Sequence, residues 1–351
     1  MLDLNAAMTD GIIPVLKTSP TVGDVHVNGP LTNISVAHFQ DMAAFIAGRV
    51  FPVVPVQYRS DVYYTFDNAD FHRDEMKPRA PSTETAGGGF SVSSDSYSCL
   101  VYGFHKDIDD QIRGNVDPQV NLDALVAKYL TYKYLIFMEK QWANTFFTTS
   151  VWTTDIGGVA SNPGSNQVLQ WNDDASNPIT DIDYYRRYML ELTGYEPNTL
   201  VLGRDVFDSI KNHPEFIDRI KYGQTPGAPA MVTINMMKQL FEIPNIYVMN
   251  AIENTAKEGA TKVHSFIAKQ KALLCYSAPA PALLSPSGGY TFSWTGYAGA
   301  GLQGQRIANM RIPLIRSDRF EIECSFDQKV VSADLGIFFN DVVAEDLNPN
   351  A

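Results

Sequence analysis

Apolar and polar positions alternate with different periods along the chain, and the strongest pattern is helical. Over residues 117–147 apolar side chains recur every three or four positions, and no glycine or further proline follows Pro118. Asp117 can cap this helix and Pro118 can occupy its first turn. Because apolar residues cover more than one stripe, we expect the helix to be packed on several sides.

Two aromatic and β-branched runs, Val62–Phe66 and Tyr97–Phe104, predict the strands of a long two-stranded ribbon. The residues between them are charged at first and then rich in Pro, Ser, Thr and Gly. An isolated two-stranded ribbon is marginally stable in water, and long loops in compact domains are usually functional. We therefore expect the ribbon to gain stability by lying on a neighbouring subunit.

The remaining segments have weaker but distinct patterns. Prolines and glycines interrupt residues 1–50, which predicts an extended arm with a short helix from Phe39 to Ile46. Helix and strand patterns alternate over 179–304 and indicate a mixed α/β domain, and 305–351 return to strand patterns.

Composition limits the class of protein. The chain has 351 residues, 45% hydrophobic and 19% charged, which excludes global disorder. A net charge of -12 disfavours broad contact with nucleic acid. Cys99, Cys275 and Cys324 are widely spaced and are expected as buried apolar residues of a protein folded in a reducing cytoplasm. No apolar run has the length of a membrane span or follows a basic start, so neither membrane nor signal peptide is expected.

Catalytic motifs are nearly absent. Gly299–Gly304 matches the dinucleotide pattern G-x-G-x-x-G, but no amphipathic helix follows it before Pro313. A glycine-rich loop is the preferred interpretation, and a nucleotide-binding α/β enzyme is kept as an alternative. The six histidines have no metal-ligand spacing. The acids of Lys106–Asp110 lack calcium-loop spacing and are read as a strand-to-helix corner, with a bound cation as the alternative. The sequence predicts no enzyme, cofactor or metal site.

Mixed charges in the predicted ribbon are the best candidates for a contact between subunits. Arginine can form forked hydrogen bonds to a neighbour's carboxylate, and mixed signs let identical copies complement one another. A solvated loop is the alternative. The predicted contact residues are Arg59, Arg73, Asp74, Glu75, Lys77, Arg79 and Glu84.

The order of these segments, and several local sequences, resembles the major capsid proteins of tailed bacteriophages, which have the HK97-type fold. The most specific stretches are 45–56, 63–66, 102–110 and 198–207. The resemblance implies an α+β chain with an N-terminal arm (1–50), an extended β-hairpin loop (51–106), a first part of a peripheral domain (107–178) with a spine helix at 117–147, an α/β axial domain (179–304) and return strands (305–351). Gly299, Gly301 and Gly304 would be a hinge between domains.

The resemblance also implies a function. The chain would assemble in the host bacterial cytoplasm as hexamers and pentamers of an icosahedral head shell. That shell would enclose double-stranded DNA without sequence-specific binding. A portal, a decoration protein and a separate scaffolding protein are expected partners, the last because no charged helical segment precedes residue 50. No covalent crosslink is predicted. The alternatives are an encapsulin-type compartment shell and another virion protein such as a decoration or tail subunit.

Overall fold

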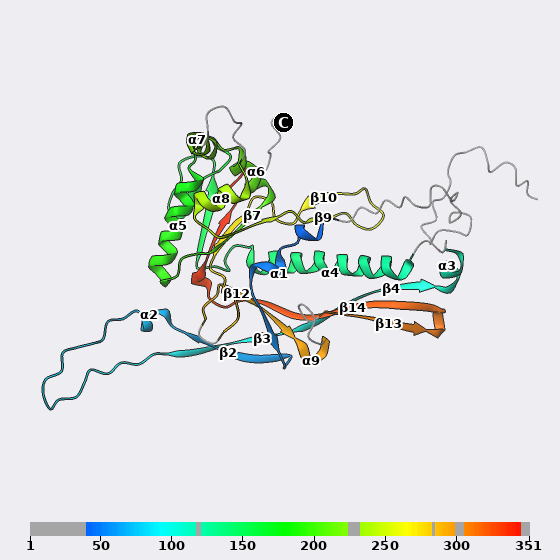
Figure 1. The fold of residues 1–351 in the computed structure, drawn as a ribbon, viewed down its shortest axis with the longest axis horizontal. Helices are drawn as coiled ribbons and strands as arrows, with labels where there is room; N and C mark the ends of the chain where they lie inside the picture. Colours follow the sequence, from blue (N-terminus) through cyan, green and yellow to red (C-terminus); the bar gives the residue numbers. More distant parts are fainter. Residues whose placement is uncertain (1–39, 117–120, 224–231, 283–284, 299–304, 345–351) are drawn as a thin grey trace, which may run out of the picture.

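The computed structural model describes residues 40–116, 121–223, 232–282, 285–298 and 305–344. Figure 1 shows an upper part with helices around a sheet, a lower part in which one long helix lies along a second sheet, and a ribbon that projects to one side. Within the described residues, no helix combines the length and apolar character needed to cross a membrane.

The long helix of the lower part is α4 (Leu122–Phe146). It begins at Leu122, where the side chain of Asn121 accepts a hydrogen bond from the N–H of Ala124 at 3.0 Å. The expected start at Asp117 is therefore wrong, because Asn121 provides the cap and residues 117–120 lie outside the described residues. The expected end near 147 is close to the observed one. Leu130, Met138 and Trp142 are buried but belong to one stripe of positions four apart, and Leu125 is 43% exposed, so burial within the chain follows mainly one stripe and not the several sides expected.

The lower sheet is organised around β14 (Ser317–Val330), the longest strand. β4 (Leu100–Asp109) pairs with one edge of β14, and β13 (Gln305–Ile312) and β12 (Gly289–Trp294) pair with the other, all antiparallel. β1 (Val53–Val56) extends the sheet by parallel pairing with β12. Alternate residues of β14, including Phe320, Ile322 and Phe326, share a core with α4, which explains the alternating pattern seen in the sequence.

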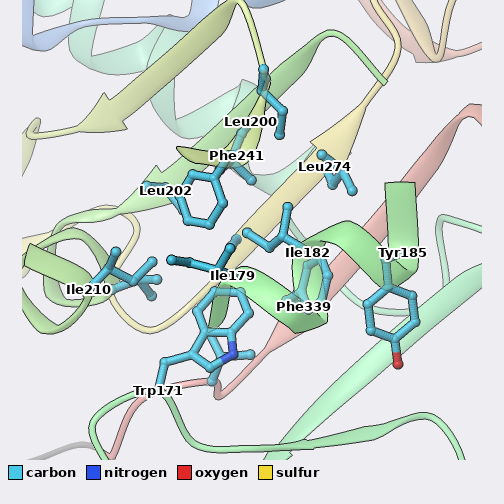
Figure 2. Close-up of a cluster of buried hydrophobic side chains, with 14 of the residues drawn as sticks. Trp171, Ile179, Ile182, Tyr185, Leu200, Leu202, Ile210, Phe241, Leu274 and Phe339 are labelled. Atoms are coloured by element: carbon cyan, nitrogen blue, oxygen red, sulfur yellow. The ribbon is translucent and has the colours of Figure 1, made fainter. Parts of the chain in front are cut away.

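The upper sheet has six strands in the order β6-β5-β15-β11-β7-β8. Their bounds are Gln167–Leu169, Thr154–Val159, Gly336–Asn340, Ala272–Cys275, Thr199–Gly203 and Asn245–Met249. One face is covered by helices α5 (Pro178–Thr193), α6 (Arg204–Asn212), α7 (Pro214–Gly223) and α8 (Ile234–Phe241). Figure 2 shows this core, with Leu200 and Leu202 of β7 near Ile182 of α5.

The other face of the upper sheet packs on α4 and forms one core with it. Leu200 and Leu202 lie in the helix-covered core, whereas Val201 between them lies in the same core as Trp142 and Phe146. Strands buried on both faces have continuous apolar runs, as observed for β7, β11 and β15. The upper sheet therefore contributes one face to each of the two cores.

Strand pairing differs from the expected domain boundaries. β5, β6 and β15 were expected in the peripheral domain, but they pair within the sheet that contains β7, β8 and β11. β12 was expected in the axial domain, but it pairs with β14 of the lower sheet. These differences arise because pairing partners are far apart in sequence and the apolar runs do not specify which partner they take.

The glycine segment expected as a hinge, Gly299, Gly301 and Gly304, lies outside the described residues. The strands before and after it, β12 and β13, both pair with β14. The segment thus connects strands of one sheet, so the flanking elements give no support to a hinge between domains.

The ribbon consists of β2 (Ser60–Phe66) and β3 (Val92–Ser98), paired antiparallel, with the short helix α2 (Asn68–Phe71) after β2. The expected helix from Phe39 to Ile46 is wrong: Met42–Ala44 form a 3-10 turn, Phe45 is extended, and α1 covers Ala47–Val50. The other elements are α3 (Asp110–Asn115), β9 (Ile252–Asn254), β10 (His264–Phe266), α9 (Thr295–Ala298) and 3-10 turns at Pro313–Ile315 and Ala333–Leu335.

Candidate functional site at the projecting ribbon

The base of the ribbon is packed on its own chain. The rings of Tyr63 and Tyr97 stack on Phe292 of β12, with centroid distances of 5.6 Å and 4.6 Å. Cys99, directly after β3, is fully buried in the same cluster. The base of the ribbon is therefore stabilised within its own chain, and the expected stabilisation by a neighbouring subunit remains a prediction for the tip.

Charged groups reinforce the base. The Nζ of Lys329 in β14 donates a hydrogen bond to Asp95 of β3 at 2.8 Å. This ammonium holds the pKa of the Asp95 carboxyl below its ordinary value. Burial, together with the hydrogen bond to Asp95, raises the pKa of Tyr63 above its ordinary range. The N–H of Ser98 donates to Asp327 at 2.9 Å, so the middle and the final residue of β3 are both tied to the lower sheet.

The tip of the ribbon, residues 72–91, is almost entirely exposed. Three rings lie where β2 and β3 open into this tip: Phe66, Phe71 and Phe90, with centroid distances between 5.7 Å and 6.1 Å. We call them the phenylalanine cluster. They remain 38%, 57% and 59% exposed, and Met76 further out is 93% exposed. Apolar side chains gathered in this way on a surface usually mark a binding site.

The structure brings most of the predicted contact residues together in this tip. Arg73 pairs with Asp70 at 3.5 Å and with Glu75 at 3.4 Å, and Asp74 accepts a hydrogen bond from the N–H of Met76. Arg79 donates to the carbonyl of Thr83. Lys77 and Glu84 are exposed, with no hydrogen bond or ion pair to another described residue.

Arg59 is the exception among the predicted residues. It lies at the base, where its Nε donates to the carbonyl of Cys99 at 3.3 Å. Sequence reasoning also missed the phenylalanine cluster, although three phenylalanines in an otherwise polar segment were a usable signal.

α2 joins the ribbon to the upper part. The side-chain amide of Asn68 donates to the carbonyl of Leu192 in α5 at 3.0 Å. The ring of His72 lies close to Gly194, whose left-handed conformation, with φ of 75°, ends α5. The start of the tip is thus held beside the end of α5.

Outside the ribbon, the described residues offer few arrangements suited to catalysis. A cavity of about 510 Å³ in the upper part is lined by Trp171, Asp208, Ser209 and His213, among others. His213 is buried, and its Nδ1 accepts a hydrogen bond from the N–H of Glu215 at 3.2 Å. This is the arrangement of a histidine that supports the fold. The described residues contain no group of three or more potential ligands arranged for a metal. Burial raises the pKa of the Cys99 and Cys324 thiols to about 12, which keeps them protonated and unreactive.

Comparison with known proteins relates this architecture to viral shells. The family model described as phage major capsid protein E matches residues 163–284. The major capsid protein of Pseudomonas phage JBD67 is 26% identical over 326 residues, which cover 91% of this chain and 97% of that protein. This chain is a phage major capsid protein. The major capsid protein of Burkholderia phage BcepMu is 28% identical over 148 residues, covering 40% of this chain and 44% of that protein.

Solved structures establish the fold of the capsid protein. A phage-related protein from Bordetella bronchiseptica matches with a TM-score of 0.63 at 21% identity, covering 86% of this chain and 94% of that one. The capsid of cyanophage P-SCSP1u matches with a TM-score of 0.55 at 10% identity, covering 89% and 91%. An encapsulin from Synechococcus elongatus matches with a TM-score of 0.52 at 9% identity, covering 91% and 97%.

The fold is of the HK97 type, with mixed α/β content. Because an encapsulin shares it, the fold alone does not separate a phage head from a bacterial compartment. The family model and the relatives in sequence do separate them, and both are phage major capsid proteins. The capsid protein is a structural, non-enzymatic subunit that assembles with copies of itself into the phage head shell, and its location is the virion.

Proposed function

We propose that the capsid protein forms hexamers and pentamers of an icosahedral shell around double-stranded DNA, with the ribbon tip lying on the adjacent copy. The observation that supports this most is the tip itself. Residues 72–91 carry charges of both signs and an almost fully exposed methionine, and little of their surface contacts the rest of the chain. Such a segment gains binding energy only from another molecule.

The predicted contact residues belong to this proposal. Arg73, Asp74, Glu75, Lys77, Arg79 and Glu84 would pair with the neighbour, while Arg59 supports the ribbon base. Each contact is modest because the charges are exposed. Closure of a shell lets every copy hold several neighbours at once, so modest contacts add up to a stable particle.

The domain division of the proposal follows strand pairing. The peripheral domain would contain α4 with β1, β4, β12, β13 and β14, and the axial domain would contain α5 to α8 with the six-stranded sheet, β5, β6 and β15 included. Residues 1–50 would be the arm and 51–106 the extended loop, whose first strand β1 and last strand β4 are shared with the peripheral sheet.

The shell would enclose the DNA without recognising its sequence. The net charge of -12 disfavours tight binding of phosphate over most of the surface. A separate scaffolding protein, a portal and a decoration protein are the further partners of this proposal, and assembly would take place in the bacterial cytoplasm.

The test is expression of the capsid protein with electron microscopy and cross-linking of purified particles. We expect closed shells, and cross-links from Lys77 to a different chain when equal amounts of isotopically light and heavy subunits are mixed. Cross-links from residues 72–91 that stay within one chain would refute the proposed role of the tip. Particles filled with a cargo enzyme and free of DNA after infection would instead favour an encapsulin-type compartment.

A further inference from the structure

Residues 40–52, which we call the bridging segment, join two separate parts of the molecule. The side-chain amide of Gln40 pairs with both backbone groups of Ile252 in β9: its Nε2 donates to the carbonyl at 2.7 Å, and its Oε1 accepts from the N–H at 2.9 Å. The same Nε2 donates to the hydroxyl of Tyr132 in α4 at 2.8 Å. The start of the bridging segment is therefore bound to the β9–β10 hairpin and to the long helix at once (Figure 1).

The other end of the bridging segment is fixed by uncharged groups. The hydroxyl of Ser277, which follows β11 of the upper sheet, donates to the carbonyl of Val50 at 2.6 Å. The side chain of Phe51 is 2% exposed, and the centroid of its ring lies 4.6 Å from that of Phe146 at the end of α4. Because none of these groups titrates near neutral pH, this end should be held equally well at every pH at which the chain is folded.

Between its two ends, the bridging segment is held by a carboxyl group that is removed from water. One oxygen of Glu139 accepts hydrogen bonds from the backbone N–H groups of both Ile46 and Ala47. Glu139 is fully buried, and Ile46 and Ala47 are 2% and 3% exposed. The other carboxyl oxygen has no hydrogen-bond partner among the described residues. A buried carboxylate with an unpaired oxygen is costly when charged, so this contact favours the protonated acid.

The charged groups near Glu139 offset this cost only in part. Arg49 of α1 favours the charged form, but its guanidinium donates to two backbone carbonyls of the bridging segment and lies over the ring of Tyr247 in β8. The next residue of α4, Lys140, pairs with Glu253 of β9 at 2.7 Å, so their opposite charges largely cancel. Burial outweighs Arg49 and the two N–H groups, and it raises the pKa of Glu139 to about 7.

We propose that protonated Glu139 holds residues 40–49 against α4, and that loss of its proton lets this part of the bridging segment open while Phe51 stays in place. Opening brings the carboxylate into water and removes the cost of burying its charge. The closed form binds the proton more tightly than the open form, so closing is favoured at low pH and becomes less favourable as pH rises to about 7. This goes beyond the proposed function, because it makes the attachment of the predicted arm to the body depend on pH.

Amide hydrogen exchange of the full, unassembled chain tests the opening, with exchange in each peptide compared with its intrinsic rate at each pH. Between pH 5 and pH 8, protection of the peptide that contains Ile46 and Ala47 should fall by on the order of fiftyfold, because the pKa of the carboxyl is about 7 when closed and about 4.5 in water. Peptides from residues 50–56 and from β14 should keep their protection. An equal loss of protection in β14, or no loss at Ile46 and Ala47, would overturn the proposal.

Two variants separate the effect of the proton from a general loosening of the bridging segment. Glu139→Gln keeps an oxygen that can accept both N–H groups but has no proton to lose, so protection at Ile46 and Ala47 should not change with pH. Gln40→Ala removes the uncharged contact to Ile252, so protection should fall by a similar factor at pH 5 and at pH 8. A wild-type pH profile in Glu139→Gln would overturn the proposal, and so would a profile without pH dependence in Gln40→Ala.

Discussion

The carboxylate of Glu139 in α4 accepts a hydrogen bond from the backbone N–H of Ala47 at 2.8 Å. The same oxygen accepts a second hydrogen bond from Ile46 at 2.9 Å. Glu139 is fully buried, and its other oxygen has no hydrogen-bond partner among the described residues. One side chain of the long helix therefore holds the chain at the point where the predicted arm meets the body.

Glu139 should make stability depend on pH. Burial raises the pKa of this carboxyl to about 7, although the two backbone N–H groups and Arg49 act in the opposite direction. In the unfolded chain its pKa is near 4.5, so the unfolded state releases the proton first as pH rises. The free energy of unfolding should then fall by on the order of 3 kcal/mol between those pH values, and the loss should be complete above pH 7.

Glu139→Gln is the matched variant, since its amide oxygen can still accept the hydrogen bonds but carries no charge. Denaturant unfolding of the unassembled chain at several pH values from 4.5 to 8 measures the effect. The wild type should lose stability over this range relative to the variant. Parallel profiles for the two proteins would show that the carboxyl is not responsible.

Gly336 should tolerate no larger side chain. A Cβ at this position in β15 would lie 2.1 Å from the ring of Trp152, which is itself buried. Gly336→Ala should lower the free energy of unfolding by about 2 to 3 kcal/mol, because a rigid ring must shift within a packed core. Gly103→Ala in β4 is the control, since its Cβ would meet only ordinary contacts of 3.6 Å or more. Thermal unfolding of both variants would detect the difference, and equal effects would contradict the packing argument.

Local sequence patterns predicted helices and strands better than they predicted which strands pair with one another. The long helix was found from its apolar spacing, but its start was misplaced because Asn121 provides the cap. Strand patterns were also found over 305–351, yet the place of β15 in the upper sheet was not. Phe338 and Phe339 lie in different cores, so this strand is apolar on both faces. The sequence of such a strand does not indicate which strand pairs with it.

The candidate site was predicted from its charges and missed in its apolar part. Mixed charges in an extended segment are visible in sequence, and the tip indeed contains them. The packing of the ribbon base on its own chain was not predicted, because Tyr63 and Tyr97 contact Phe292, which is about two hundred residues away in sequence.

Phe292 should control the order of the ribbon. Phe292→Ala removes the ring on which Tyr63 and Tyr97 stack, and deletion of a buried aromatic side chain costs about 3 to 5 kcal/mol. The rate of amide hydrogen exchange should then increase more in β2 and β3 than in α4. Phe90→Ala, which removes a ring that is 59% exposed, should leave exchange at the ribbon base unchanged. Uniformly faster exchange in both elements after Phe292→Ala would argue against a specific anchor.

Reversal of the arginine charges in the tip should separate folding from assembly. Arg73 is 57% exposed and pairs with the nearby Asp70 of α2 and Glu75 of the tip, and Arg79 is exposed and donates to the carbonyl of Thr83. Arg73→Glu with Arg79→Glu should therefore change the unfolding temperature of the unassembled chain very little, because exposed ion pairs contribute at most about 1 kcal/mol.

The same double variant should form few or no closed particles by electron microscopy, since its tip would repel carboxylates on the adjacent copy. Arg73→Lys with Arg79→Lys keeps the charge but removes the forked donor geometry, so its particle yield should lie between those of the wild type and the Glu variant. Because all three proteins should fold equally well, a difference in yield would be attributable to contact between copies. Wild-type yields from the Glu variant would mean that these two arginines remain in solvent in the assembled shell.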